Sequence, residues 1–150
     1  MGSRRRAREI AFQVLYKLDI DNGHPGEALD IYWENFHPTE KARDFCQRLV
    51  EGVSRNRNEI DRLIEENSEN WTLKRMAVVD RNILRVAAFE LLYCPDIPPK
   101  ATLNEAIELA KKFGAEDSSA FINGILDKIH SLQEIREEGR GTGDAGGERG

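Results

Sequence analysis

Apolar side chains recur at helical spacing from the start of the chain. In residues 3–20 they form one stripe, which comprises Ala7, Ile10, Ala11, Val14 and Leu18. A period of three to four residues predicts an amphipathic helix with one buried face.

The same period continues through most of the remaining chain. Five further helices are predicted, over residues 27–35, 42–64, 76–93, 102–113 and 118–130. Pro38 ends the first of these, Gly52 is expected to bend the second, and the third is apolar enough to be the central helix. Because strand-type alternation is absent from the sequence, the predicted fold class is all-α, with about six or seven helices.

Capping residues refine two of these helix ends. Thr102 and Glu105 have the spacing of a capping box, which predicts a helix start at Thr102, and Gly114 suits the C-terminal end of the same helix. Asp117 or Ser118 is the expected N-cap of the last helix.

Length and composition indicate a single domain over residues 1–136. The final segment, 137–150, holds six glycines and no large apolar side chain, and is predicted to be a disordered tail. The sequence has neither an apolar run long enough to span a membrane nor a secretory signal. Cys46 and Cys94 are isolated and are expected to be buried thiols of a cytoplasmic protein.

Charge is distributed unevenly along the chain. The net charge is −5, yet residues 1–18 hold five basic side chains and a single acidic one. Arg4, Arg5 and Arg6 stand at a predicted helix start, where the positive end of the helix dipole disfavours cations. A basic arm on an acidic body therefore indicates an anionic partner.

Candidate catalytic and metal-ligating groups are sparse. The three histidines are scattered and no glycine-rich phosphate loop is present, so no metal, cofactor or catalytic residue is predicted and the chain is interpreted as a binding protein rather than an enzyme. Asp80, Arg81 and Arg85 are expected to form a structural ion-pair network.

Two aromatic side chains of the first helix fall opposite its apolar stripe. Phe12 and Tyr16 either lie in a core that covers the helix on both sides or join the arginines in a surface on which unpaired bases stack. A similar choice applies to residues 113–121, where capping groups and Phe113 either complete the fold or contact RNA.

Three segments together resemble the NusB family of bacterial transcription antitermination factors. They are "RRRAREIAFQVLY", "WTLKRMAVVDRNILRVAAFELLY" and "IPPKATLNEAIELAKKFGAEDSSAFINGILDKI", which appear in order within residues 4–130. The resemblance implies two small helical bundles that share a core. It also implies binding of single-stranded boxA RNA in ribosomal RNA leaders together with NusE, a ribosomal small-subunit protein, which helps RNA polymerase to read through terminators.

The resemblance also assigns RNA-binding residues. One group lies in the first helix and comprises Arg4, Arg5, Arg6, Arg8, Gln13 and Tyr16. The other group lies near the start of the last helix and comprises Phe113, Asp117, Ser118, Phe121 and Asn123. Ala120 departs from the family pattern, since many relatives carry lysine there, and this removes one phosphate contact.

Two questions stay open at the level of sequence. A protein–protein adaptor that binds an acidic partner through the same arginines is an alternative to RNA binding. Some relatives dimerise through surfaces that would cover the RNA site, so a homodimer is also compatible with the sequence.

Overall fold

The computed structural model describes residues 2–69 and 71–139 in full, and only the backbone of residues 140–149. Within the described part, all regular structure is helical: seven α-helices and one short 3₁₀ helix, η1. The elements are α1 (Ser3–Asp21), α2 (Pro25–Asn35), α3 (Glu40–Arg55), α4 (Arg57–Glu66), η1 (Leu73–Arg75), α5 (Val78–Tyr93), α6 (Pro99–Phe113) and α7 (Ser118–Arg149). The predicted tail, 137–150, falls almost entirely outside the fully described residues and stays a prediction.

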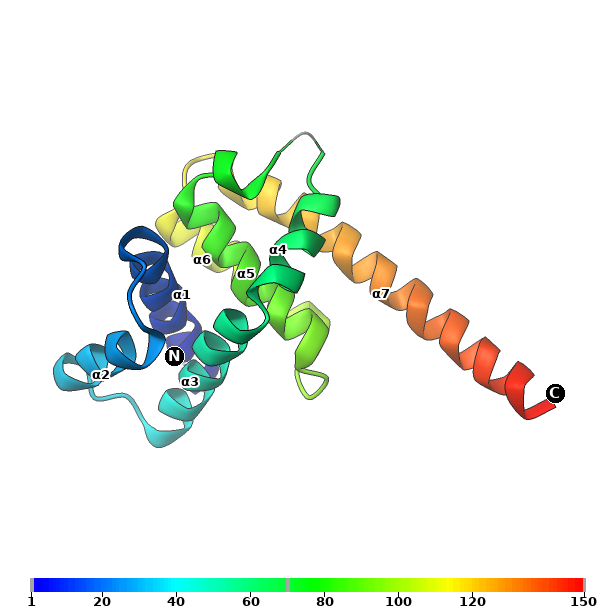
Figure 1. Cartoon of the computed structure of the whole chain (residues 1–150), viewed down its shortest axis with the longest axis horizontal. Helices are drawn as coiled ribbons and strands as arrows, with labels where there is room; N and C mark the ends of the chain where they lie inside the picture. The colour runs from blue at the N-terminus through cyan, green and yellow to red at the C-terminus, as the bar shows by residue number, and fades with distance from the viewer. Residues whose placement is uncertain (1, 70, 150) are drawn as a thin grey trace.

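The helices form two groups that meet at α5. In the first, α1 packs against α2 and α3; in the second, α4, α6 and α7 pack around α5, which also contacts α1 and α3 (Figure 1). Fully buried aliphatic side chains from both groups make one continuous core, among them Ile10, Leu49, Ile83 and Ile122. The all-helical fold and the central position of α5 are thus confirmed.

The long helix predicted over residues 42–64 is in fact two helices. The break lies at Asn56, whose side-chain amide and backbone N–H both donate to the Gly52 carbonyl, at 2.9 and 3.1 Å. Gly52 does not bend the chain: a Cβ there would overlap the Phe89 ring, so the glycine lets α5 approach α3 closely. Packing, not backbone flexibility, explains this glycine.

The predicted capping box is also wrong. α6 begins at Pro99, which has no N–H to leave unpaired and suits a first helical position, so Thr102 lies inside the helix. Its hydroxyl donates to Glu90 at 2.9 Å, and Glu105 accepts from Arg5. Gly114 is confirmed as the C-terminal cap, with its N–H donating to the Ala110 carbonyl at 2.8 Å.

The expected ion-pair network exists with different acidic partners. Asp19 accepts from Arg81 at 2.6 Å and from Arg85 at 3.0 Å, and Arg85 also donates to Asp61 at 2.9 Å. Asp80 is not part of this network, because it is adjacent to Arg81 on the helix and adjacent residues point in different directions. Burial acts to raise the pKa of Asp19, but these hydrogen bonds and charges outweigh it and hold the pKa below its ordinary value. The network ties α1 and α4 to α5.

The cysteines and the hydropathy of the helices also bear on the predictions. Cys46 and Cys94 are buried free thiols, as expected. Among the helices described, none combines the length and the apolar character needed to cross a bilayer.

Candidate nucleic-acid interface

Three arginines lie half-exposed in the first turn of α1: Arg4, Arg5 and Arg6. No side chain caps this helix start, and its first turn holds no acidic residue. The unpaired N–H groups and the positive end of the dipole favour an anion here, as the guanidinium groups do. The three arginines are therefore exposed at a position that favours an anion, as contacts to phosphate require.

Arg8, which the resemblance to the family assigns to RNA binding, is buried beneath this surface. Its side chain is 5% exposed and that of its partner Glu90 is 1% exposed. Arg8 Nε and a terminal nitrogen donate to the two Glu90 oxygens at 2.9 and 2.7 Å, and Thr102 donates to the same carboxylate. The Phe45 ring lies 5.4 Å from the guanidinium carbon. α5 and α6 cover this side of α1, so Arg8 is engaged within the fold and is not exposed to a phosphate.

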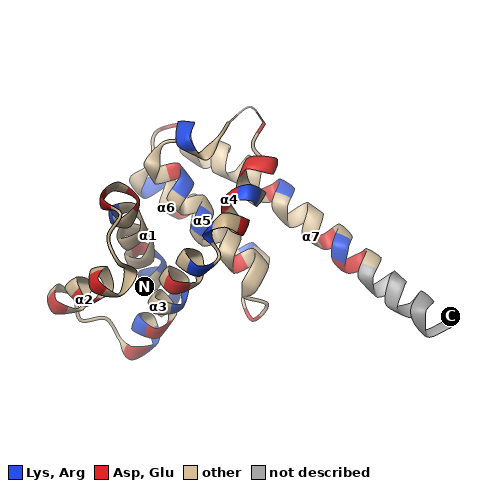
Figure 2. Cartoon of the chain, viewed as in Figure 1, with Lys and Arg blue, Asp and Glu red and all other residues tan. Residues whose placement is uncertain are grey.

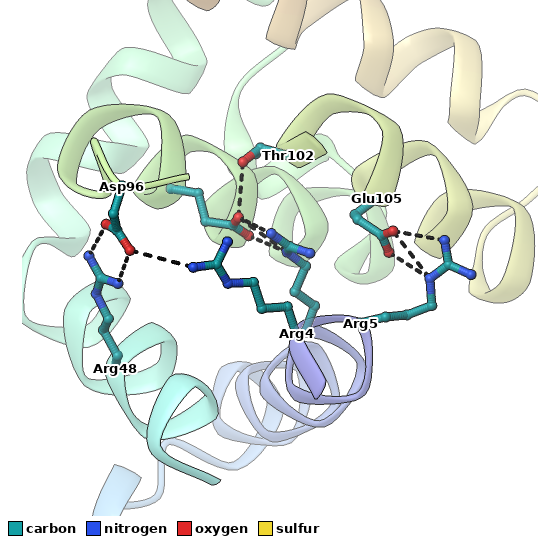
Figure 3. Close-up of polar contacts among 8 residues, drawn as sticks. Arg4, Arg5, Arg48, Asp96, Thr102 and Glu105 are labelled. Carbon is teal, nitrogen blue, oxygen red and sulfur yellow. Dashed lines mark hydrogen bonds and ion pairs between the residues drawn. The ribbon is translucent and has the colours of Figure 1, made fainter. Parts of the chain in front are cut away.

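Arg5 is fixed by a two-pronged contact across the α1–α6 boundary. Its Nε donates to Glu105 at 3.0 Å and a terminal nitrogen donates at 2.8 Å (Figure 3). The hydrogen bond to Glu105 raises the pKa of the Arg5 guanidinium further above its already high ordinary value. Arg5 is charged as any arginine is, and the contact with Glu105 directs its guanidinium toward α6.

Arg4 has a weaker anchor on the other side of the helix start. Its guanidinium lies 3.7 Å from Asp96, a carboxylate that Arg48 engages more closely with two hydrogen bonds of 2.8 and 3.1 Å (Figure 3). Those hydrogen bonds lower the pKa of Asp96 to about 2. Because Arg48 already neutralises Asp96, Arg4 keeps most of its charge available for another anion.

A groove of about 340 Å³ runs between α1 and α6 beside Arg5. Its lining residues are Arg5, Glu9, Glu105, Glu108, Leu109, Lys111 and Lys112. Lys112 Nζ donates to Glu9 at 2.9 Å, and Arg6 approaches the same carboxylate at 3.6 Å. Basic and acidic residues are also interspersed along the other helices of the described part of the chain (Figure 2).

Three aromatic residues lie together where α1 meets the end of α6: Phe12 is buried, whereas Tyr16 and Phe113 are partly exposed. Phe12 is buried, which confirms that the helix is covered on this side as well. Its ring contacts Phe113 at a centroid distance of 5.1 Å and Tyr16 edge-on at 6.2 Å. Tyr16 and Phe113 are only partly buried, and Lys112 Nζ lies 5.5 Å from the Phe113 centroid. Phe12 thus joins residues from the two predicted groups into one surface.

Gln13 lies on the opposite flank of this face, against α2. The Tyr32 hydroxyl donates to Gln13 Oε1 at 3.2 Å, and both side chains are partly buried. Gln13 is therefore oriented by α2 while its amide stays near the surface.

At the start of α7, Asp117 is exposed but Ser118 is not. Ser118 is 2% exposed, and its hydroxyl accepts from the Ala115 N–H at 2.9 Å. A Cβ on Gly114 would come within 2.6 Å of the Ser118 Cβ, so these two residues close the turn together. In this structure the buried Ser118 hydroxyl therefore closes the turn, whereas Asp117 and Ala120 face solvent.

The remaining predicted residues lie farther along α7. Phe121 is partly buried and meets Trp71 edge-on at a centroid distance of 6.2 Å. Asn123 donates to Asp127 at 3.3 Å. Trp71 is 47% exposed and Arg75 lies over it at 5.9 Å. Sequence reasoning missed this exposed Trp71–Arg75 pair, because a lone tryptophan in a turn gives no signal of its exposure.

Sequence reasoning also missed the side chains that complete the groove. Lys112, Glu9 and Glu105 acquire their roles only when α6 is packed beside α1, although the Lys111–Lys112 pair directly before Phe113 was a usable signal. The geometry offers half-exposed cations beside partly exposed aromatic rings. Such a combination binds the phosphates and unpaired bases of a nucleic acid strand.

Comparison with known proteins gives consistent matches over most of the chain. The model of the NusB family matches residues 5–131. The chain is 52% identical over 130 residues to the transcription antitermination protein NusB of Desulfatibacillum aliphaticivorans, which covers 87% of this chain and 91% of that one. It is 53% identical over 145 residues to that of Geotalea uraniireducens, covering 91% and 100%.

Solved structures agree with the sequence matches. NusB of T. maritima superposes with a TM-score of 0.78 at 40% identity, over 85% of this chain and 90% of that one. A crystal structure of the antitermination factors NusB and NusE with double-stranded RNA gives a TM-score of 0.81 at 31% identity, over 88% and 98%.

Proposed function

The chain belongs to the NusB family of transcription antitermination factors, and from that premise we propose that it binds single-stranded boxA RNA together with NusE. The complex forms on nascent ribosomal RNA leaders in the cytoplasm and helps RNA polymerase to read through terminators. The family is one of RNA-binding factors rather than of enzymes, so the chemistry required of the site is recognition alone.

One observation carries the proposal: half-exposed arginines gather at the start of α1, and an accessible tyrosine lies three turns along the same helix, on the side of Arg5. Arg4, Arg5 and Arg6 supply contacts to phosphates, which dominate the affinity for nucleic acids. Tyr16 supplies a ring against which an unpaired base can stack. The proposed contacts are completed by Gln13, Lys112, Phe113, Asp117, Phe121 and Asn123, while Arg8 and Ser118 are removed from the set.

The surface at the start of α1 and beside the α1–α6 groove is nearly neutral on its own, so tight binding of RNA needs a basic partner. The chain carries a net charge of −5, and Arg5, Arg6 and Lys112 each lie within 4 Å of a carboxylate. NusB and NusE occur together with RNA in one of the similar structures. NusE would extend the surface over more nucleotides, so the pair should bind RNA more tightly than this chain alone.

Titration of labelled boxA RNA with and without NusE tests the proposal. We expect NusE to tighten binding at least tenfold, and a single strand to compete better than a duplex of the same sequence or an acidic peptide. Identical affinities with and without NusE would count against the cooperative role. Equal competition by the acidic peptide would favour a protein–protein adaptor.

Replacing Tyr16 by alanine should weaken RNA binding by about 1–3 kcal/mol, which is the usual contribution of one stacked base. Tyr16→Phe keeps the ring and should bind nearly as the wild type does. Electrophoretic mobility shifts on the two variants, with thermal melts to confirm folding, make the comparison. Equal losses in both variants would assign the effect to the hydroxyl and not to stacking.

A further inference from the structure

The carboxylates beside the α1–α6 groove are far less exposed than the cations that they hold. Glu105 is 17% exposed and its partner Arg5 is 49% exposed; Glu9 is 8% exposed and its partner Lys112 is 53% exposed. In an ordinary surface ion pair both side chains are solvated and contribute little. Here the acids form the floor of the groove, and the cations stand above them toward solvent.

The hydrogen bonds leave one edge of the Arg5 guanidinium uncommitted. Glu105 engages Nε and one terminal nitrogen, at distances of 2.8 to 3.2 Å. A guanidinium has five N–H donors in a fixed plane, so the edge formed by the two terminal nitrogens retains donors that point away from Glu105. That edge has the geometry for a two-pronged contact to phosphate. Glu105 therefore determines the direction in which Arg5 presents it.

The same carboxylates also cancel the charge of the groove. Its lining holds three basic residues and three acidic ones, the acidic ones being Glu9, Glu105 and Glu108. A groove without net charge attracts RNA weakly at long range, since that attraction grows with the number of phosphates neutralised. Affinity must then come from short-range contacts between Arg5 or Lys112 and phosphates that lie where these side chains are directed.

Resting on the proposed function, we propose that Glu105 and Glu9 are positioning residues that give this face its RNA specificity. They orient Arg5 and Lys112 toward phosphates of one backbone path, and they suppress binding of RNA that follows another path. Their removal should free the cations to contact any strand, so discrimination falls even where total affinity rises.

The test compares Glu105→Gln with Glu108→Gln in the full chain. Both variants remove one negative charge from the same helix and groove, but Glu108 is exposed and lies 3.8 Å from Lys111 alone. Affinities for boxA RNA and for a scrambled single strand of equal length are measured over a range of salt concentrations, with thermal melts alongside. Glu9→Gln removes the negative charge of the other positioning residue. Glu105→Asp keeps a negative charge at position 105.

We expect Glu105→Gln to bind the scrambled strand about fivefold more tightly at ~0.1 M salt and to steepen its salt slope by about 0.7. Binding to boxA RNA should stay unchanged or weaken, so the specificity ratio falls about fivefold or more. Glu105→Asp should restore much of the ratio. Glu108→Gln should leave the ratio near that of the wild type.

Two results would overturn the inference. An unchanged ratio in folded Glu105→Gln would show that the carboxylate does not set specificity, and equal changes in Glu105→Gln and Glu108→Gln would reduce the effect to net charge. Neither result touches the proposed function, which is tested separately on the wild-type chain; if the wild-type chain does not bind boxA RNA, the inference fails with it.

Discussion

Replacing Arg8 by alanine is expected to lower the free energy of unfolding by about 3–5 kcal/mol, the usual cost of removing one partner of a buried ion pair. The variant leaves Glu90 with a buried charge, because α5 and α6 exclude water from that carboxylate. Among the described residues, only the Thr102 hydroxyl, at 2.9 Å, would continue to donate to it. Urea unfolding followed by circular dichroism measures the loss.

Two variants separate this mechanism from a general effect of losing an arginine. Arg4→Ala removes the same side chain one turn earlier, where it is half-exposed and 3.7 Å from Asp96, and should cost less than about 1 kcal/mol. Arg8→Met combined with Glu90→Leu removes both charges and should recover most of the stability lost by Arg8→Ala. Wild-type stability in Arg8→Ala would contradict the assignment of Arg8 to the core.

The periodicity of the sequence was sufficient to predict the helices, but it did not reveal every helix end. The apolar stripe through Ile10 and Val14 marked α1 correctly, and the apolar segment over residues 76–93 marked α5 as central. The break at Asn56 was missed because the apolar period continues across it. The capping box at Thr102 was wrong because its two side chains bond to other helices: Thr102 donates to Glu90, and Glu105 accepts from Arg5.

The exposure of the candidate site residues was predictable only where it follows from the position of a residue on its own helix. Arg5 and Tyr16 satisfy that condition, and both reach the surface. Arg8 falls outside the apolar stripe, and whether that side of the helix is covered depends on α5, where its partner Glu90 is 82 positions away in the chain. The burial of Ser118 was not predictable for a similar reason, since the family resemblance does not reveal that its hydroxyl turns inward and accepts from the Ala115 N–H.

Replacing Arg4, Arg5 and Arg6 together by alanine should weaken binding to boxA RNA by about 100-fold at ~0.1 M salt. The estimate takes roughly fivefold for each phosphate contact, which follows from counterion release along a single strand. The fold should survive, because all three guanidinium groups are half-exposed and none is part of the buried network. Fluorescence anisotropy with labelled RNA measures the affinity, and a thermal melt confirms folding.

A matched control keeps the change in net charge but moves it elsewhere. Arg55, Arg62 and Arg136 are exposed and lie on α3, α4 and α7, away from the start of α1. Their simultaneous replacement by alanine should weaken binding less than about fivefold at ~0.1 M salt, through the general field of the protein alone. Similar losses in both triple variants would remove the special role of the N-terminal arginines.

The salt dependence of boxA RNA binding by the wild type and by the Arg4/Arg5/Arg6 triple variant tests the central claim most directly. If these side chains neutralise phosphates, the slope of log affinity against log salt concentration should be shallower in the variant by about 2, with about 0.7 for each lost contact. The same slope and the same affinity in a folded variant would contradict the account.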